Sequence, residues 1–152
     1  MPASHILLLP DLDRTQRLAA EAAKTAVAGD CFLLEGPVGA GKTAFSRAFV
    51  QAALGRAEDV PSPTFTLVQT YETPTFEIWH CDLYRLTSAD ELIELGLEDA
   101  FTSAVTLIEW PDRLGDMAPT NAQRLSFEVV DEDVRRLSIH GDARWAKRGA
   151  TA

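Results

Sequence analysis

A phosphate-binding signature occupies residues Gly36–Thr43, whose sequence GPVGAGKT fits the pattern G-x-x-x-x-G-K-[ST] at every required position. The glycines of such a loop let backbone N–H groups close around the phosphates of a nucleotide, beside the positive end of the helix that follows. The Lys42 ammonium is expected to reach the β- and γ-phosphates, and the Thr43 hydroxyl to bind Mg²⁺. The sequence therefore predicts a P-loop that binds a nucleoside triphosphate.

The segments on either side of this loop have the patterns that a P-loop needs. Cys31–Leu34 is a short apolar run that predicts a buried strand, and Thr43–Leu54 predicts a helix that Gly55 ends. A strand before the loop and a helix after it distinguish a functional P-loop from a chance match. The context therefore supports the nucleotide site.

Two carboxylates, Asp82 and Glu109, each lie at the end of a segment that predicts a strand. Glu109 ends the apolar run Val105–Glu109, which is the Walker B pattern, and Asp82 ends the run Ile78–Asp82. Phosphoryl chemistry requires an acidic residue near the metal and a group that positions the attacking molecule. Each carboxylate is a candidate for holding the metal or activating a water, and the sequence does not decide which one is the base.

A polar row is expected around Asp82. His80, Asp82 and Tyr84 share one strand face if the strand continues that far. A histidine at such a position is more often a hydrogen-bonded structural residue than a catalyst, so we interpret His80 as a structural neighbour of the site.

Two further segments are candidates for contact with the nucleotide. The hydroxyls of Ser62–Thr66 follow the P-loop helix by one loop, where Thr64 or Thr66 could meet the γ-phosphate or the metal and act as a switch. The alternative is that this segment is simply a turn leading into a strand. Trp110, beside Glu109, either covers the nucleotide or a partner surface, or caps the core.

The rest of the chain predicts strands interleaved with helices in one domain. The predicted strands are His5–Leu9, Cys31–Leu34, Thr64–Tyr71, Phe76–Asp82, Ala104–Ile108, Arg124–Val130 and Val134–His140. The predicted helices are Arg14–Ala28, Thr43–Leu54 and one that begins after Ser88 and ends near Gly96. This order predicts an α/β fold, a single-domain P-loop NTPase with a mixed β-sheet flanked by helices, in residues 1–141. Residues 142–152 are expected to form a flexible C-terminal tail.

Composition and charge limit the possible partners. The chain has 152 residues, a formal net charge of −9 and two cysteines without metal-ligand spacing, which we expect to be buried thiols in a reducing cytosol. No apolar run approaches the ~20 residues that span a bilayer. We therefore expect no membrane association and a cytoplasmic location. A protein that grips nucleic acid by itself usually carries a basic stripe, so any action on RNA is expected to go through a protein partner.

Four ordered motifs together resemble the TsaE family, the small bacterial ATPases of tRNA threonylcarbamoyladenosine synthesis. These motifs are the P-loop, SPTFTLV at 62–68, HCDLYRL at 80–86 and IEWP at 108–111. The resemblance runs from about Leu9 to His140. It implies an ATPase that uses ATP and Mg²⁺, binds the TsaB–TsaD complex and supports modification of adenosine 37 in tRNAs that read codons beginning with A. The tRNA is contacted only through that complex, and the oligomeric state is left open.

The resemblance also implies roles for individual residues of this chain. The phosphates would be held by Gly36 and by the run Gly39–Ala44, which includes Ala40, Gly41, Lys42, Thr43 and Ala44. Leu12, in the segment Asp11–Thr15, would approach the adenine, Thr64 would belong to a nucleotide switch, and Trp110 would support activity. Lys42, Asp82 and Glu109 would be catalytic, and Thr43, Asp82 and Glu109 would serve the Mg²⁺.

Two other functions of a P-loop remain as alternatives. A small-molecule kinase normally carries an arginine-bearing lid over the phosphates, but the segment between Ser88 and Ala104 contains no arginine. A GTP-binding switch normally reads guanine with an Asn-Lys-x-Asp segment, which is absent from this chain. The kinase is the stronger of the two alternatives.

Overall fold

One seven-stranded mixed sheet organises the chain. The computed structural model describes residues 3–141 except for residues 57, 62, 64 and 65. The strands are β1 (Ala3–Leu9), β2 (Cys31–Glu35), β3 (Val68–Glu72), β4 (Glu77–Asp82), β5 (Val105–Glu109), β6 (Gln123–Val129) and β7 (Arg135–Gly141), in the spatial order β1-β7-β6-β2-β5-β4-β3. Strand β2 runs parallel to both neighbours, β5 and β6, and β4 runs parallel to β5. The pairs β1–β7, β6–β7 and β3–β4 are antiparallel.

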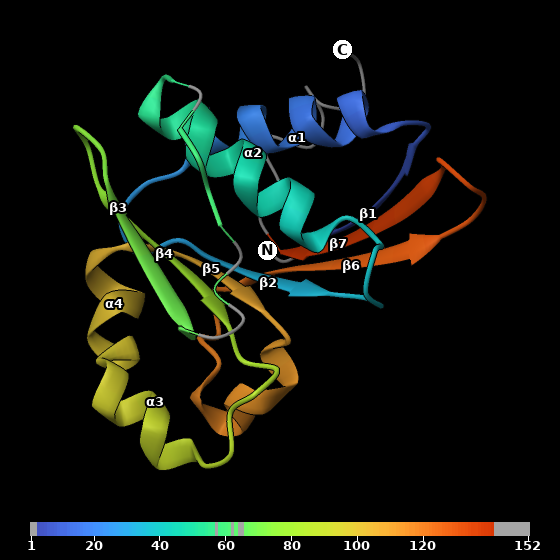
Figure 1. Cartoon of the computed structure of the whole chain (residues 1–152). Coiled ribbons are helices and arrows are strands. Elements are labelled where there is room, and N and C mark those ends of the chain that lie inside the picture. The colour runs from blue at the N-terminus through green and yellow to red at the C-terminus, as the bar shows by residue number, and fades with distance from the viewer. Residues whose placement is uncertain (1–2, 57, 62, 64–65, 142–152) are drawn as a thin grey trace.

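Helices cover the two faces of this sheet (Figure 1). The helices are α1 (Leu12–Thr25), α2 (Lys42–Leu54), α3 (Ala89–Leu95), α4 (Leu97–Ser103) and the 3₁₀ helix η1 (Pro111–Met117). Helices α1 and α2 lie together on one face, and α3 and α4 lie on the other (Figure 1). The predicted α/β architecture, a mixed β-sheet flanked by helices, is confirmed.

Each face has its own apolar core. Under α1 and α2, the rings of Phe32 and Phe49 meet edge to face with centroids 5.3 Å apart, and Phe45 meets Phe127 at 6.1 Å. Under α3 and α4, the buried side chains include Cys31 and Cys81, both free thiols as predicted. Burial raises the pKa of Cys31 to about 12, so this thiol is uncharged and unreactive at neutral pH.

Local backbone chemistry explains where the predicted elements shift. Helix α1 begins at Leu12 because the Asp11 side chain accepts a hydrogen bond from the Arg14 N–H at 2.9 Å. Strand β3 begins at Val68 rather than Thr64, because Leu67 has a left-handed φ of 68° and donates its N–H to the Pro63 carbonyl. The predicted strand was therefore wrong at Thr66 and Leu67.

Two elements were missed by the sequence pattern, α4 and η1. Gly96, with φ 79°, ends α3 and at the same time precedes α4, so a single left-handed residue separates two seven-residue helices. The predicted tail, residues 142–152, lies outside the described residues. Within the described part of the chain, no helix has both the length and the hydropathy to cross a membrane.

Candidate functional site

The loop Gly36–Thr43 connects the carboxyl end of β2 to the start of α2, and its glycines have backbone angles that other residues rarely adopt. Gly36 has φ 138°, and a Cβ built there would lie 2.6 Å from the Phe127 carbonyl oxygen of β6. Gly41 has φ 118° and precedes α2 without any side-chain cap. The first N–H groups of α2 are therefore left available to an anion, as expected of a phosphate-binding loop.

Replacing Gly36 with alanine is expected to destabilise the fold by roughly 2–5 kcal/mol, because backbone strain and a steric clash act together. Gly39→Ala is the matched control, since Gly39 also has a positive φ, 82°, but a Cβ added there would meet no atom within 4 Å. Its expected cost is roughly 1–3 kcal/mol, from strain alone. Urea unfolding of both variants measures the difference, and equal losses would show that the contact with Phe127 is unimportant.

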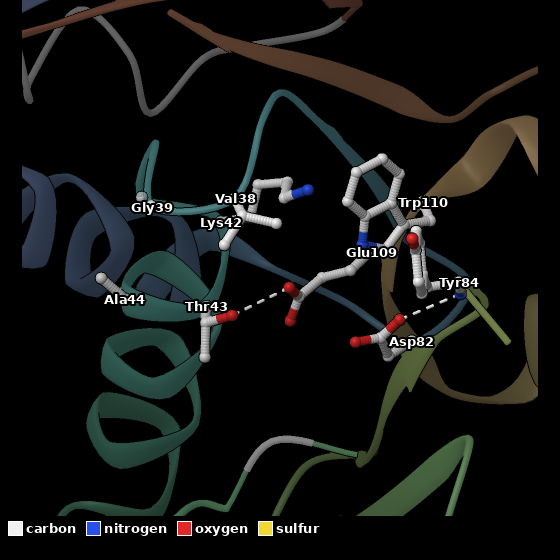
Figure 2. Close-up of a pocket in the computed structure, with 10 residues that line it drawn as sticks. Val38, Gly39, Lys42, Thr43, Ala44, Asp82, Tyr84, Glu109 and Trp110 are labelled. Atoms are coloured by element: carbon white, nitrogen blue, oxygen red, sulfur yellow. Dashed lines mark hydrogen bonds between the residues drawn. The ribbon is translucent and has the colours of Figure 1, made fainter. Parts of the chain in front are cut away.

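Lys42 begins α2 and is almost fully buried, with 5% of its surface exposed. Its ammonium donates to the Gly36 carbonyl at 2.6 Å and lies 3.6 Å from the centroid of the Trp110 ring. Burial lowers the pKa of Lys42, and the nearby carboxylates Glu109 and Asp82 partly oppose this shift. One carbonyl and one aromatic face thus hold the side chain beside the loop. Figure 2 shows Lys42 next to Trp110.

Glu109 lies at the end of β5, and both of its carboxylate oxygens have partners. Thr43 donates its hydroxyl to Oε1 at 2.9 Å, and His80 contacts Oε2 through Nε2 at 2.7 Å. An ionised carboxylate only accepts, so Nε2 of His80 carries the proton. His80 is fully buried, and its Nδ1 has no hydrogen-bond partner among the described residues. The interpretation of His80 as a hydrogen-bonded neighbour of the site agrees with this contact.

Asp82 ends β4 and is paired in register with Glu109. Its Oδ1 accepts the Tyr84 N–H at 3.0 Å, which turns the chain away from the sheet. The strand therefore does not reach Tyr84, and the expected single row of His80, Asp82 and Tyr84 is wrong. Tyr84 instead packs against Trp110, with ring centroids 5.0 Å apart.

Trp110 follows Glu109 in a left-handed conformation, with φ 60° and ψ 55°. Such a conformation is uncommon for a bulky residue and costs of order 1–3 kcal/mol. It directs the indole over Lys42 rather than into the core (Figure 2).

These side chains line an open cavity of about 550 Å³ at the carboxyl ends of β2, β4 and β5. The cavity is lined by Val38, Gly39, Gly41, Lys42, Thr43, Ala44, Asp82, Tyr84, Glu109 and Trp110. Figure 2 shows the Thr43–Glu109 pair and Asp82 on neighbouring walls, with Trp110 beside Lys42. Of the other predicted residues, Ala40 is fully buried and donates its N–H to the Pro37 carbonyl. Thr64 lies outside the described residues.

A second, smaller cavity of about 160 Å³ shares Gly39, Gly41 and Ala44 with the first. It brings Leu12, predicted to approach the base, next to Gly39, Gly41 and Ala44. It also includes Asp133 and Arg135, which the sequence pattern did not single out. These two residues lie in the β6–β7 hairpin, and no short motif marks them, so only the fold could reveal their position.

The oxygen ligands of the first cavity suit a nucleotide-bound Mg²⁺. In the part of the chain that the structure describes, no group of three or more His, Cys, Asp or Glu side chains could hold a metal by itself. Mg²⁺ is usually held by one or two protein groups together with substrate phosphates and waters. Thr43 and Glu109, whose oxygens are 2.9 Å apart, provide such a partial set, and Asp82 lines the same cavity.

Comparison with known proteins agrees with this geometry. The model of the family described as Threonylcarbamoyl adenosine biosynthesis protein TsaE matches residues 9–137. The chain belongs to the TsaE family. The family takes part in tRNA threonylcarbamoyladenosine biosynthesis. The matched range includes the loop Gly36–Thr43, both carboxylates and Trp110, so the whole first cavity lies within the TsaE match.

Individual TsaE relatives agree with the family match, and a solved structure agrees in fold. The chain is 40% identical over 132 residues to the tRNA threonylcarbamoyladenosine biosynthesis protein TsaE of Rickettsia bellii, covering 87% of this chain and 92% of the relative. It is 33% identical over 128 residues to TsaE of Bacillus subtilis, covering 84% and 79% respectively. The crystal structure of Bacillus subtilis YdiB has the same fold, with a TM-score of 0.77, 23% identity and coverage of 99% of this chain and 97% of that one.

Proposed function

We propose that this TsaE family member is a Mg²⁺-dependent ATPase that acts with the TsaB–TsaD complex in the cytoplasm. Its ATP hydrolysis supports threonylcarbamoylation of adenosine 37 in tRNAs that read codons beginning with A. The observation that carries the proposal is the convergence of Lys42, Thr43 and Glu109 around one cavity at the start of α2. The resemblance of this chain to the TsaE family supplies the pathway and the partners.

The proposal gives the candidate residues the following roles. The loop N–H groups and Lys42 bind and orient the phosphates, and Leu12 lies on the side of the loop where the base would enter. Thr43 and Glu109 would hold Mg²⁺, which neutralises charge on the phosphates during transfer. Asp82, which lines the same cavity and is 5% exposed, would orient the attacking water. Thr64 and its neighbours are proposed to sense the nucleotide.

The net charge of −9 fits a protein that meets tRNA through other proteins rather than by a basic face. The decisive experiment mixes the purified chain with TsaB, TsaD, threonylcarbamoyl-adenylate and tRNA, and follows ATP loss together with formation of the modified nucleoside. We expect slow hydrolysis by the chain alone and a marked change in rate with the complex. Hydrolysis that is indifferent to the complex would refute the accessory role, and phosphate transfer to a small alcohol or nucleoside would favour a kinase.

The His80–Glu109 contact gives a prediction for this activity. His80→Leu removes the N–H that orients Glu109 and leaves a buried carboxylate oxygen without its partner. Loss of such a supporting contact typically costs 10–100-fold in metal affinity or activity, so we expect a loss of about that size in kcat or in the Mg²⁺ dependence. His80→Gln places an amide N–H near the position of Nε2 and is expected to recover most of the activity. Equal defects in the two variants would contradict a positioning role.

A further inference from the structure

Arg135, at the start of β7, connects two segments that are far apart in the sequence. Its Nη1 donates to the carbonyls of Asp131, Glu132 and Val134, each at 3.1 Å. Its Nη2 donates to the Gly39 carbonyl at 3.2 Å. One guanidinium therefore ties the turn of the β6–β7 hairpin to the middle of the loop Gly36–Thr43.

The hydrogen bond from Arg135 to Gly39 comes from a residue outside the loop Gly36–Thr43. The bonds from Lys42 to Gly36 and from Ala40 to Pro37 both lie within the loop segment itself, whereas the bond from Arg135 comes from another part of the sheet. A Cβ added at Gly39 would meet no atom within 4 Å, so little packing restrains this side of the loop. A hydrogen bond to the Gly39 carbonyl is therefore well placed to fix the direction of the peptide plane.

Arg135 also lines the smaller cavity, where it lies with Asp133 beside Leu12. The hairpin turn that forms this wall is held by the same guanidinium, and by hydrogen bonds from the N–H groups of Val130 and Asp131 to the Val134 carbonyl. The wall of the smaller cavity and the phosphate-binding loop are thus joined through one side chain.

We propose that Arg135 is a positioning residue that holds the loop Gly36–Thr43 in its phosphate-binding shape by tying Gly39 to the β6–β7 hairpin. The inference rests on the proposed function, because it takes the ligand of the loop to be a triphosphate. The planar guanidinium of Arg135 donates hydrogen bonds to four carbonyls. The ammonium of a lysine does not have this fork geometry and could not make the same set of bonds.

The test measures binding of Mg–ATP and of Mg–tripolyphosphate, which has phosphates but no base or ribose, by calorimetry. The variants are Arg135→Ala and Arg135→Lys, and the matched control is Arg136→Ala, whose guanidinium bonds Glu128 at 3.2 Å on the neighbouring strand. We expect both Arg135 variants to weaken both ligands by a similar factor, roughly tenfold, and the control to change either by less than about twofold. Steady-state kinetics should show a raised KM with kcat largely kept.

Each other outcome overturns the inference in a recognisable way. Weakening of ATP alone would mean that Arg135 contacts the base or ribose and does not hold the loop. Full recovery in Arg135→Lys would mean that only its charge matters. Wild-type affinity for both ligands in Arg135→Ala would refute the inference while leaving the proposed function intact. A wild-type chain that binds neither ligand would refute the proposed function and this inference together. If Arg135→Ala does not fold, the affinities of Arg135→Lys for the two ligands are compared with those of the wild-type chain instead.

Discussion

Lys42→Ala is expected to lose Mg–ATP binding by about 100-fold or more and to show no measurable hydrolysis. The substitution removes the one side-chain cation that lines the first cavity among the described residues, and charged hydrogen bonds to phosphate in a buried site are among the strongest available. Binding is measured by calorimetry and turnover by phosphate release. Lys24→Ala is the control, because its side chain is 68% exposed and bonds Glu21 on the surface of α1. Normal ATP hydrolysis by Lys42→Ala would refute the site assignment.

The pKa of Lys42 provides an independent measurement of the same contact. Burial disfavours the charged ammonium and therefore holds this pKa below its ordinary value of 10.5. Phosphate oxygens next to the ammonium favour the charged form, so nucleotide binding is expected to raise the pKa. The chain has only three lysines, Lys24, Lys42 and Lys147, so NMR titration of the side-chain signals can be assigned by substitution. A pKa of Lys42 that does not move with Mg–ATP would place the phosphates elsewhere.

Glu109→Gln is expected to keep ATP binding within about fivefold and to lose turnover by about 10²–10³-fold. Glutamine keeps the size of the side chain but replaces one acceptor oxygen with a donor, so the contacts with Thr43 and His80 can both be kept only if one of them reverses its direction. The carboxylate that would serve Mg²⁺ is also lost, so the Mg²⁺ concentration needed for half-maximal activity should rise. Calorimetry and a Mg²⁺ titration of phosphate release separate these effects.

Asp82→Asn distinguishes the two carboxylates and serves as the comparison for Glu109→Gln. Asp82 accepts the Tyr84 N–H and lines the cavity, whereas the Thr43 hydroxyl donates to Glu109. We therefore expect a large loss of kcat with a nearly unchanged Mg²⁺ requirement. If Asp82→Asn raised the Mg²⁺ requirement and Glu109→Gln did not, Asp82 would be the residue that serves Mg²⁺ and Glu109 the one that orients the water.

The sequence predicted the parts of the site that are encoded by local spacing. The loop Gly36–Thr43 and the carboxylates at the ends of two strands could be recognised because each motif is short and contiguous. The hydrogen bonds between these site residues could not be predicted from local spacing. The bonds from Thr43 and His80 to Glu109 join residues 66 and 29 positions apart, and depend on β4 and β5 lying next to each other near the start of α2.

Arg135 and Trp110 show two further reasons why part of the site could not be predicted. Arg135 lies 96 positions from Gly39 in an ordinary hairpin, and its role depends on β6 pairing with β2. Trp110 was recognised as a candidate, but its left-handed backbone, which turns the indole toward Lys42, has no sequence signal because bulky residues rarely adopt it. The short helix α4 was missed for a similar reason, since Gly96 reads as a stop and not as a bend between two helices.

The contacts of Lys42 with the Gly36 carbonyl and the Trp110 ring affect which ligands the site can hold. The ammonium has a carbonyl and an indole as partners, so a ligand must offer more negative charge than these neutral groups to draw it away. A monophosphate offers little advantage, whereas a polyphosphate chain offers much. In the ATPase that we propose, the shorter product of cleavage would compete less well, and the return of the ammonium to these neighbours would help to empty the pocket for the next turnover.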